Sequence, residues 1–274
     1  MTLQATLKKP VAMLDDLGGQ LRFYARSIGW SGRTIRRYKK EVFRLLAEVS
    51  LGTGALTVIG GTVGVIGFLA FFTGTEVGLQ GYSALNQLGS AAFTGFVSAY
   101  FNTREIAPLV AGIALAATVG CGFTAQLGAM RISEEVDALE VMAIPSMPFL
   151  VATRVVGGLI AIIPLYVVGL LSSYFASRLV VTQFYGQSAG TYDHYFNAFL
   201  PPGDVLWSFG KVLVFAVTVI LIHCYHGYNA SGGPAGVGVA VGRAVRTSIV
   251  AINVLDLLMS MAIWGASTTV RLAG

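Results

Sequence analysis

The chain has 274 residues, of which 11% are charged, with a net charge of +5 and a mean hydropathy of +0.72. Soluble domains carry about 25% charged residues, so this composition excludes a water-soluble globule and predicts an integral membrane protein. Residues 1–48 hold ten of the eighteen bases but four of the thirteen acids. The positive charge therefore belongs to this leading segment, and we expect no nucleic-acid partner.

The leading segment 1–48 is predicted to be a basic amphipathic arm. Its apolar residues recur at spacings of three and four, with bases on most of the other faces: Ile35, Tyr38, Val42, Leu45 and Val49. Such a helix lies in the headgroup layer with its apolar side toward the lipid tails. The positive-inside rule places the arm, and with it the N-terminus, in the cytoplasm. We expect the arm to anchor the topology, not to touch substrate.

Uncharged runs long enough to cross a bilayer follow the arm. A hydrocarbon core about 30 Å thick needs roughly 20 helical residues. The runs are 49–75, 77–103, 106–130, 155–177, 212–242 and 247–270, the last containing Asp256. They predict an all-α, multi-pass domain over residues 49–270.

The second and third runs together are too long for one straight transmembrane helix. As one straight helix, residues 83–130 would be about 72 Å long at 1.5 Å per residue. We therefore predict a break near Arg104, Glu105 and Pro108, and a single crossing whose first part is re-entrant or strongly bent. The total is then five transmembrane helices, the second one long and broken, with six as the alternative.

An acidic helix is predicted over residues 132–142, ending before Pro145. Glu134 and Glu135 fall in its first turn, where the helix dipole favours negative charge. Its apolar residues share one stripe: Ile132, Val136 and Leu139. An exposed stripe on so short a helix suggests a covering partner, and at this point a docking helix and a solvated connector stay equally open.

Two motifs suggest chemistry but lack the required surroundings. Residues 186–190 match G-x-S-x-G, so a membrane-embedded lipid hydrolase or acyltransferase using Ser188 and His194 is the alternative function. A nucleophile elbow needs a strand, a turn and a helix, whereas this match lies in the predicted outer loop 182–204. His223 and His226 lie one helical turn apart without a third ligand nearby, so we predict no metal site.

Several segments resemble the signature of the MlaE/YrbE permease family. They follow the family's order over about residues 45–268: 79–82, 104–108, 125–130, 134–142 and 232–238. Residues 184–188 and 190–196 look most like the B-type YrbE subunit of actinobacterial Mce lipid importers.

This resemblance implies the permease half of an ABC lipid transporter in the plasma membrane, without catalytic activity of its own. The implied partners are an A-type YrbE permease, a cytoplasmic ATPase dimer that binds ATP and Mg²⁺, and MCE-domain proteins outside. The cargo would be a sterol or a fatty or mycolic acid. The chain has no G-x-x-x-x-G-K-[ST] phosphate loop, so we expect no cofactor on it.

The resemblance also assigns roles to particular residues. It makes 132–142 the coupling helix, with these ATPase-coupling residues: Arg131, Ser133, Glu134, Glu135, Asp137, Leu139 and Glu140. It implies a lipid pocket at the outer end of the first span and the segment after it, where the candidates are Phe71, Phe72, Val77, Leu85 and Leu88.

Four ionisable residues are expected at membrane depth: Arg104, Glu105, Lys211 and Asp256. Charges there are costly and usually functional. We predict that Glu105 pairs with Lys211, and that Asp256 pairs with Lys211 or Arg104. The network either links pocket closure to the coupling helix or is a structural ion network that holds the bundle together.

Overall fold

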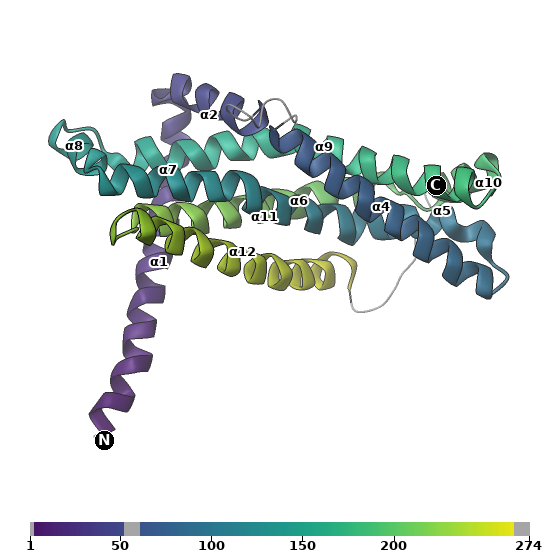
Figure 1. Ribbon diagram of the computed structural model, residues 1–274, viewed down its shortest axis with the longest axis horizontal. Helices are drawn as coiled ribbons and strands as arrows, with labels where there is room; N and C mark the ends of the chain where they lie inside the picture. The colour runs from purple at the N-terminus through teal and green to yellow at the C-terminus, as the bar shows by residue number, and fades with distance from the viewer. Residues whose placement is uncertain (1–2, 52–60, 266–274) are drawn as a thin grey trace.

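A computed structural model describes residues 3–51 and 61–265 of the chain. Every element in these two ranges is helical, so the predicted all-α class is confirmed (Figure 1). The start of the first predicted span, residues 52–60, lies outside the described residues.

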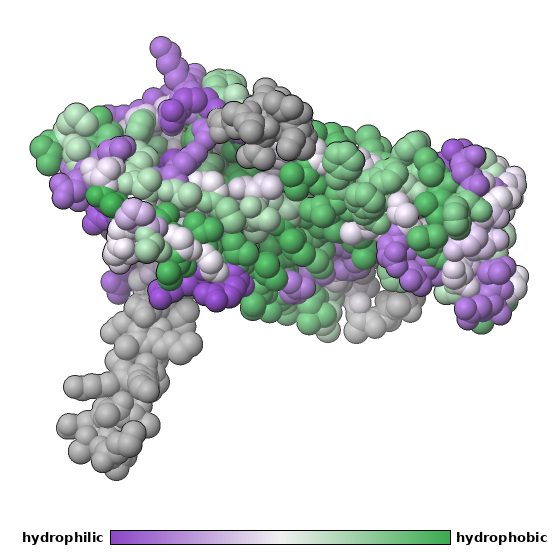
Figure 2. All heavy atoms as spheres, viewed as in Figure 1, coloured by the Kyte–Doolittle hydropathy of each residue, from purple (hydrophilic) through white to green (hydrophobic). Residues whose placement is uncertain are grey.

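Five helical runs in the described part are long and apolar enough to cross a membrane. They are Gly61–Gln87, Ala91–Ile132, Met147–Phe184, Pro202–Tyr228 and Gly233–Trp264. The runs lie along the long axis of the molecule (Figure 1). Figure 2 shows hydrophobic residues over the middle of the bundle and hydrophilic residues gathered toward both ends. This arrangement suits a bundle that crosses a bilayer, and it confirms five spans.

The second run is a continuous helical path that contains two π-helical segments, η2 and η3. The first run is helix α4 (Gly61–Gln87), so residues 83–87 complete α4 and are not part of a re-entrant loop. The chain reverses at 88–90, where Gly89 has a φ of 67°. The second run then contains η1 (Ala91–Phe93), α5 (Thr94–Val97), η2 (Ser98–Ile106), α6 (Ala107–Leu115), η3 (Ala116–Gly120) and α7 (Cys121–Ile132).

The interruption predicted near Arg104 takes the form of a π-helix. Segment η2 is π-helical, and Pro108 follows it in the first turn of α6. Because the helix is continuous here, Pro108 leaves the carbonyl oxygen of Arg104 without its usual backbone donor, and π turns inside longer helices are often found at functional positions. The helical path therefore continues through the charged residues.

The remaining spans follow with short connections. The third run comprises η4 (Met147–Ala152), α9 (Thr153–Leu179) and η5 (Val180–Phe184), and α10 (Ala189–Ala198) covers the end of the bundle next to α5. The last two spans are α11 (Pro202–Tyr228) and α12 (Gly233–Trp264). The uncharged run 212–242 therefore combines the end of α11 with the start of α12, because the turn between them carries no charge.

Glycines let α4 approach α9 closely. A Cβ atom on Gly74 would lie 2.3 Å from the carbonyl oxygen of Ser173, closer than any side chain permits. Ser177 Oγ donates a hydrogen bond of 2.5 Å to the carbonyl oxygen of Gly74. Small residues and hydroxyl bonds of this kind hold helices together in lipid, where hydrophobic burial between helices contributes little.

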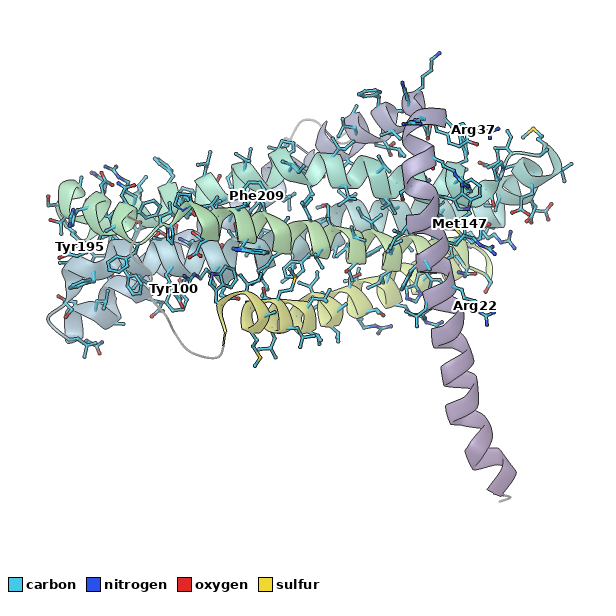
Figure 3. All side chains as sticks on the ribbon, turned by 180° about the vertical axis from the view of Figure 1, so that it is seen from behind. Arg22, Arg37, Tyr100, Met147, Tyr195 and Phe209 are labelled. Carbon is cyan, nitrogen blue, oxygen red and sulfur yellow. The ribbon has the colours of Figure 1, made fainter. Side chains whose placement is uncertain are left out.

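The arm forms two helices where the sequence predicted one. Helix α1 (Leu3–Arg37) ends before Tyr38, and α2 (Lys39–Leu51) begins after it. Figures 1 and 3 show α1 lying across one end of the bundle, with Met147 next to it. Phe23 on α1 contacts the rings of Tyr225 and Tyr228, with centroids 5.4 and 5.7 Å away. A transverse helix at the end of a bundle fits the headgroup layer.

The apolar side of the arm was predicted to face the lipid tails, but it packs on the bundle instead. Val42, Leu45 and Val49 are buried. A Cβ on Gly157 of α9 would be 3.4 Å from Leu45 Cβ. The absence of a side chain at Gly157 therefore lets α2 pack closely on α9. The side chain of Ile35 lies outside the described residues.

Candidate functional site

Lys211 on α11 is the centre of a charge cluster. Its side chain is fully buried, and its Nζ lies 2.7 Å from Asp256 Oδ1 and 3.2 Å from Glu105 Oε2. The ammonium also donates to the carbonyl oxygen of Arg104 (2.7 Å) and to Ser260 Oγ (2.8 Å), and Ser260 Oγ donates to Glu105 Oε1 (2.7 Å). Both pairs predicted for Lys211 are present, and they join η2, α11 and α12.

Arg104 pairs with a carboxylate that the sequence reasoning missed. Its Nη2 and Nε lie 2.6 and 2.7 Å from Asp204 Oδ2, so the pair considered between Arg104 and Asp256 does not form. The guanidinium also stacks over Tyr100, 4.1 Å from the ring centroid, and Trp264 Nε1 donates to Asp204 Oδ1 at 2.9 Å. Helix α11 begins at Pro202, so Asp204 lies in the first turn of α11. Pro202 is the sequence signal that could have placed Asp204 at the start of this span.

The cluster is costly to disturb. Ion pairs in a low-dielectric interior balance the desolvation of their charges against mutual attraction and hydrogen bonds. Removing one partner leaves an uncompensated charge, at a cost of about 3–5 kcal/mol. The cluster therefore fixes η2 against α11 and α12, whatever further role it has.

A second polar chain links the arm to the second and third runs. Arg154 on α9 is buried, and its Nη2 donates to Gln126 Oε1 on α7 at 3.2 Å. Gln126 Nε2 in turn donates to a carboxylate oxygen of Glu48 on α2. Arg154 Nη1 donates to the carbonyl oxygen of Leu150 at 2.7 Å. Helices α2, α7 and α9 are thus tied together near the end of the bundle where α1 lies.

The acidic helix is shorter than predicted. Helix α8 covers Glu135–Val141, whereas Arg131 and Ile132 complete α7. Glu134 is the N-terminal cap of α8 with a φ of 61°, in the left-handed region. The predicted helix over 132–142 is therefore a tight turn followed by a two-turn helix, because the backbone reverses at 133–134 to leave α7.

The apolar stripe of this helix faces its own bundle. Val136 is fully buried and Leu139 packs against the hydrophobic core, so these two residues are covered without a partner. Ile132, on α7, is exposed instead. The apolar residues that α8 and its C-terminal end present outward are Val141 and Met142, which are 89% and 61% exposed.

The polar residues of the acidic segment lie on the surface. The exposed ones are Ser133, Glu134, Glu135, Asp137 and Glu140, and Arg131 is half-buried. Arg131 Nη1 lies 2.6 Å from Asp137 Oδ1, Ser133 Oγ donates to Glu135 Oε1 at 2.9 Å, and Ser146 Oγ donates to Glu140 Oε1 at 2.7 Å. These contacts orient the acids outward at the same end of the bundle as α1 (Figure 1).

The lipid-pocket candidates do not meet in one hollow. Phe71 is half-buried against Phe175, with ring centroids 6.5 Å apart. Phe72 and Leu88 are 65% and 76% exposed, and Val77 and Leu85 are half-buried along α4. The first-span candidates lie along α4, while Leu88 lies in the turn after it, so they describe a surface of the bundle.

The hydrolase constellation is not supported. Ser188 caps α10 and His194 lies within it, both exposed, and no strand occurs in residues 3–51 or 61–265. Asp193, next to His194 in the sequence, pairs with Arg178. His223 Nδ1 lies 2.8 Å from Thr124 Oγ1, and the described chain contains no group of three metal-binding side chains.

Comparisons with known proteins agree with this architecture. The family model described as "Permease MlaE" matches residues 52–262. A probable ABC transporter permease protein of Rickettsia bellii is 30% identical over 72% of this chain and 76% of its own length. The intermembrane phospholipid transport system permease protein MlaE of Haemophilus influenzae is 25% identical over 93% of this chain and 99% of its own. The chloroplast protein TRIGALACTOSYLDIACYLGLYCEROL 1 of Arabidopsis thaliana is 30% identical over 73% of this chain and 57% of its own length.

Proposed function

The chain belongs to the MlaE permease family, and from this we propose that it is the membrane-spanning subunit of an ABC lipid transporter. It performs no covalent chemistry, and a separate ATPase dimer binds ATP and Mg²⁺. At the finer level we propose a B-type YrbE subunit of an Mce system. It pairs with an A-type YrbE permease and moves a sterol or a fatty or mycolic acid between MCE-domain proteins and the inner membrane.

One observation carries this proposal: a single helical run joins the acidic surface to the charge cluster. The run Ala91–Ile132 contains Arg104 and Glu105 in its π-helical segment and ends at the turn into α8. A rigid helix transmits a displacement at one end to the other, and π segments often mark functional positions. Movement of α8 by a motor would therefore reach the contacts of Lys211.

The exposed part of α8 is suited to protein contact. The coupling residues are Arg131, Ser133, Glu134, Glu135, Asp137, Leu139 and Glu140. The acids and the exposed Val141 and Met142 form a mixed acidic and apolar surface, which a basic, partly apolar groove on the ATPase would complement. Leu139 contributes by seating α8 on the bundle, since it packs inward.

The orientation follows from charge. The arm 1–48 carries most of the bases and lies at the same end as α8 (Figure 1). The positive-inside rule assigns this end to the cytoplasm, where ATP is available. The opposite end, with α5 and α10, then faces the MCE-domain proteins, and the domain 49–270 crosses the plasma membrane. The surface along α4 with Phe71, Phe72, Val77, Leu85 and Leu88 is our proposed lipid contact.

Charge reversal on α8 tests the proposal. In the reconstituted complex, Glu135→Lys combined with Asp137→Lys should abolish ATPase association and lipid-dependent ATP hydrolysis, while the membrane domain keeps its unfolding temperature. Asn197→Lys on α10 also adds positive charge, but at the opposite end of the bundle, and should leave hydrolysis unchanged. Full hydrolysis in the α8 double variant would contradict docking there. Mass spectrometry of lipid co-purified with the complex identifies the cargo.

A further inference from the structure

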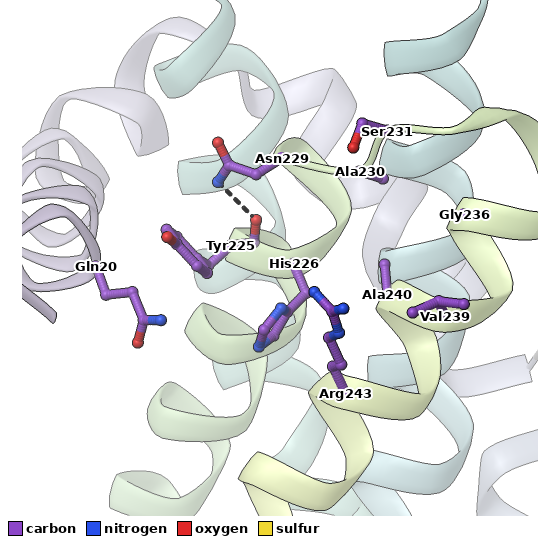
Figure 4. A pocket seen from close by; sticks show the side chains of 10 residues that line it. All are labelled: Gln20, Tyr225, His226, Asn229, Ala230, Ser231, Gly236, Val239, Ala240 and Arg243. Carbon is purple, nitrogen blue, oxygen red and sulfur yellow. Dashed lines mark hydrogen bonds between the residues drawn. The ribbon is translucent and has the colours of Figure 1, made fainter. Parts of the chain in front are cut away.

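A groove lies between the arm and the last two spans. One part of the groove is a hollow of about 490 Å³ between α1, the end of α11 and the start of α12. The polar side chains that line it are Gln20, Tyr225, His226, Asn229, Ser231 and Arg243. Figure 4 shows Arg243 and His226 next to each other, with Gln20 across the space from them. The hollow is thus polar, carries a guanidinium and is bounded on one side by the arm.

A second hollow continues the first along α12. It measures about 740 Å³ and shares Gln20 with the first one. Arg246 and Thr247 lie on its wall, and the other α11 and α12 residues that line it are mostly apolar: Leu221, Ile222, Val250, Val254 and Leu255. The two hollows form one groove with a basic, polar head and an apolar tail.

The two arginines of the groove are available for a ligand. Arg243 and Arg246 are exposed, and neither forms a salt bridge with the side chains described in residues 18–49 and 61–265. They lie three residues apart on α12, hence on neighbouring positions of one face. Arg243 lines the first hollow and Arg246 the second, so an anion where the two hollows meet at Gln20 would have a guanidinium group on either side.

The groove lies at the depth where a phospholipid changes from headgroup to acyl chain. Helix α1 lies across the bundle end (Figure 1), which marks the headgroup layer, and Gln20 of α1 lines the head of the groove. From Arg246 to Val254 the helix rises about 12 Å, so the apolar tail reaches well into the hydrocarbon. The charge and the apolar limb thus follow the order of a lipid molecule.

We propose that this groove binds one anionic glycerophospholipid from the leaflet on the arm's side. Its phosphate contacts Arg243 and Arg246, and one acyl chain lies along α12 between Leu255 and Ile222. A soluble phosphate would use the head and leave the apolar limb empty, which is why a lipid is the occupant. This site lies on α1, α11 and α12, whereas the proposed cargo surface lies on α4 and the turn after it, and it does not depend on which lipid is transported.

Lipid retention by the intact complex tests the site. The complex is purified from membranes, exchanged into nanodiscs of phosphatidylcholine with or without phosphatidylglycerol, and analysed by native mass spectrometry. Arg243→Gln with Arg246→Gln should weaken phosphatidylglycerol retention about 25-fold, or about fivefold for each arginine. Arg243→Lys with Arg246→Lys should retain most of the binding. Ala251→Phe, which fills the apolar limb without changing charge, should also weaken retention.

Two controls make the result decisive. Lys40→Gln removes an exposed base of the arm outside the groove and should leave retention unchanged. Glycerol phosphate added to the nanodiscs should not displace the lipid. Equal retention of phosphatidylcholine and phosphatidylglycerol, unchanged retention in the double glutamine variant, or displacement by glycerol phosphate would each overturn the proposal.

Discussion

Replacing Lys211 with methionine removes the one cation that contacts both Glu105 and Asp256 within the described chain. Methionine has a similar length, so packing changes little and the loss is chiefly electrostatic. Lys211 is fully buried, and the side chain of Asp256 is 12% exposed. Leaving such carboxylates without their cation costs about 3–5 kcal/mol, a large part of a typical stability of about 5–15 kcal/mol. We expect a correspondingly lower unfolding temperature in detergent.

Neutralising the partners separates the electrostatic cost from other effects. The triple variant Glu105→Gln, Lys211→Met and Asp256→Asn removes the unpaired charges and should recover most of the lost stability. Thermal unfolding of the purified complex, followed by tryptophan fluorescence, measures both variants. If Lys211→Met alone unfolds within about 1 kcal/mol of the native chain, the account of the cluster is wrong.

The same variants distinguish the two roles of the cluster. If the network is purely structural, the triple variant, once its stability is recovered, should transport lipid and couple ATP hydrolysis normally. A network that links the spans to α8 predicts a folded complex with uncoupled hydrolysis. Both roles predict a folded triple variant, so ATPase coupling is the measurement that decides.

Gly74→Ala should separate α4 from α9 and destabilise the bundle by about 1–3 kcal/mol, because the new Cβ would lie 2.3 Å from the Ser173 oxygen; Gly67→Ala, with its nearest atom at 3.7 Å, is the neutral control in thermal unfolding. Phe23→Ala should cost about 3–5 kcal/mol and make α1 accessible to protease, whereas Leu21→Ala, at an exposed position, should not. The guanidinium of Arg178 donates to Asp193 and lowers the pKa of that carboxyl below its usual range. The pair therefore stabilises the fold above the ordinary pKa of about 4, and this gain disappears as the pH falls through the folded-state pKa. Because both side chains are exposed, Asp193→Asn should cost at most about 1 kcal/mol at pH 7, and a larger loss in pH-dependent unfolding would refute this.

The sequence predicted the spans because charge is nearly absent from lipid-facing helices. Six uncharged runs, with residues 83–130 counted as a single crossing, predicted five spans, and the rare charges within them identified Lys211 and its two acidic partners. These inferences succeed because the bilayer penalises charge strongly and so makes it rare.

Boundaries and covered faces could not be predicted in the same way. The turn at Gly89 carries no charge, although Asn86 and Gly89 are residue types that end helices, and the run 212–242 hides the α11–α12 turn for the same reason. Whether Val136 faces a partner or its own bundle depends on where α7 reverses. The pairing of Arg104 with Asp204 depends on contacts between residues 100 positions apart in the sequence.

The central claim is that the basic arm and the acidic helix α8 lie together on the cytoplasmic side. The test uses three variants of a chain in which Cys121 and Cys224 are replaced by serine. Each variant carries one cysteine at an exposed position: Lys40→Cys, Glu140→Cys or Asn197→Cys. In right-side-out vesicles an impermeant maleimide should label Asn197→Cys alone, and in inside-out vesicles it should label the other two. Labelling of Glu140→Cys and Lys40→Cys from opposite sides would contradict the account.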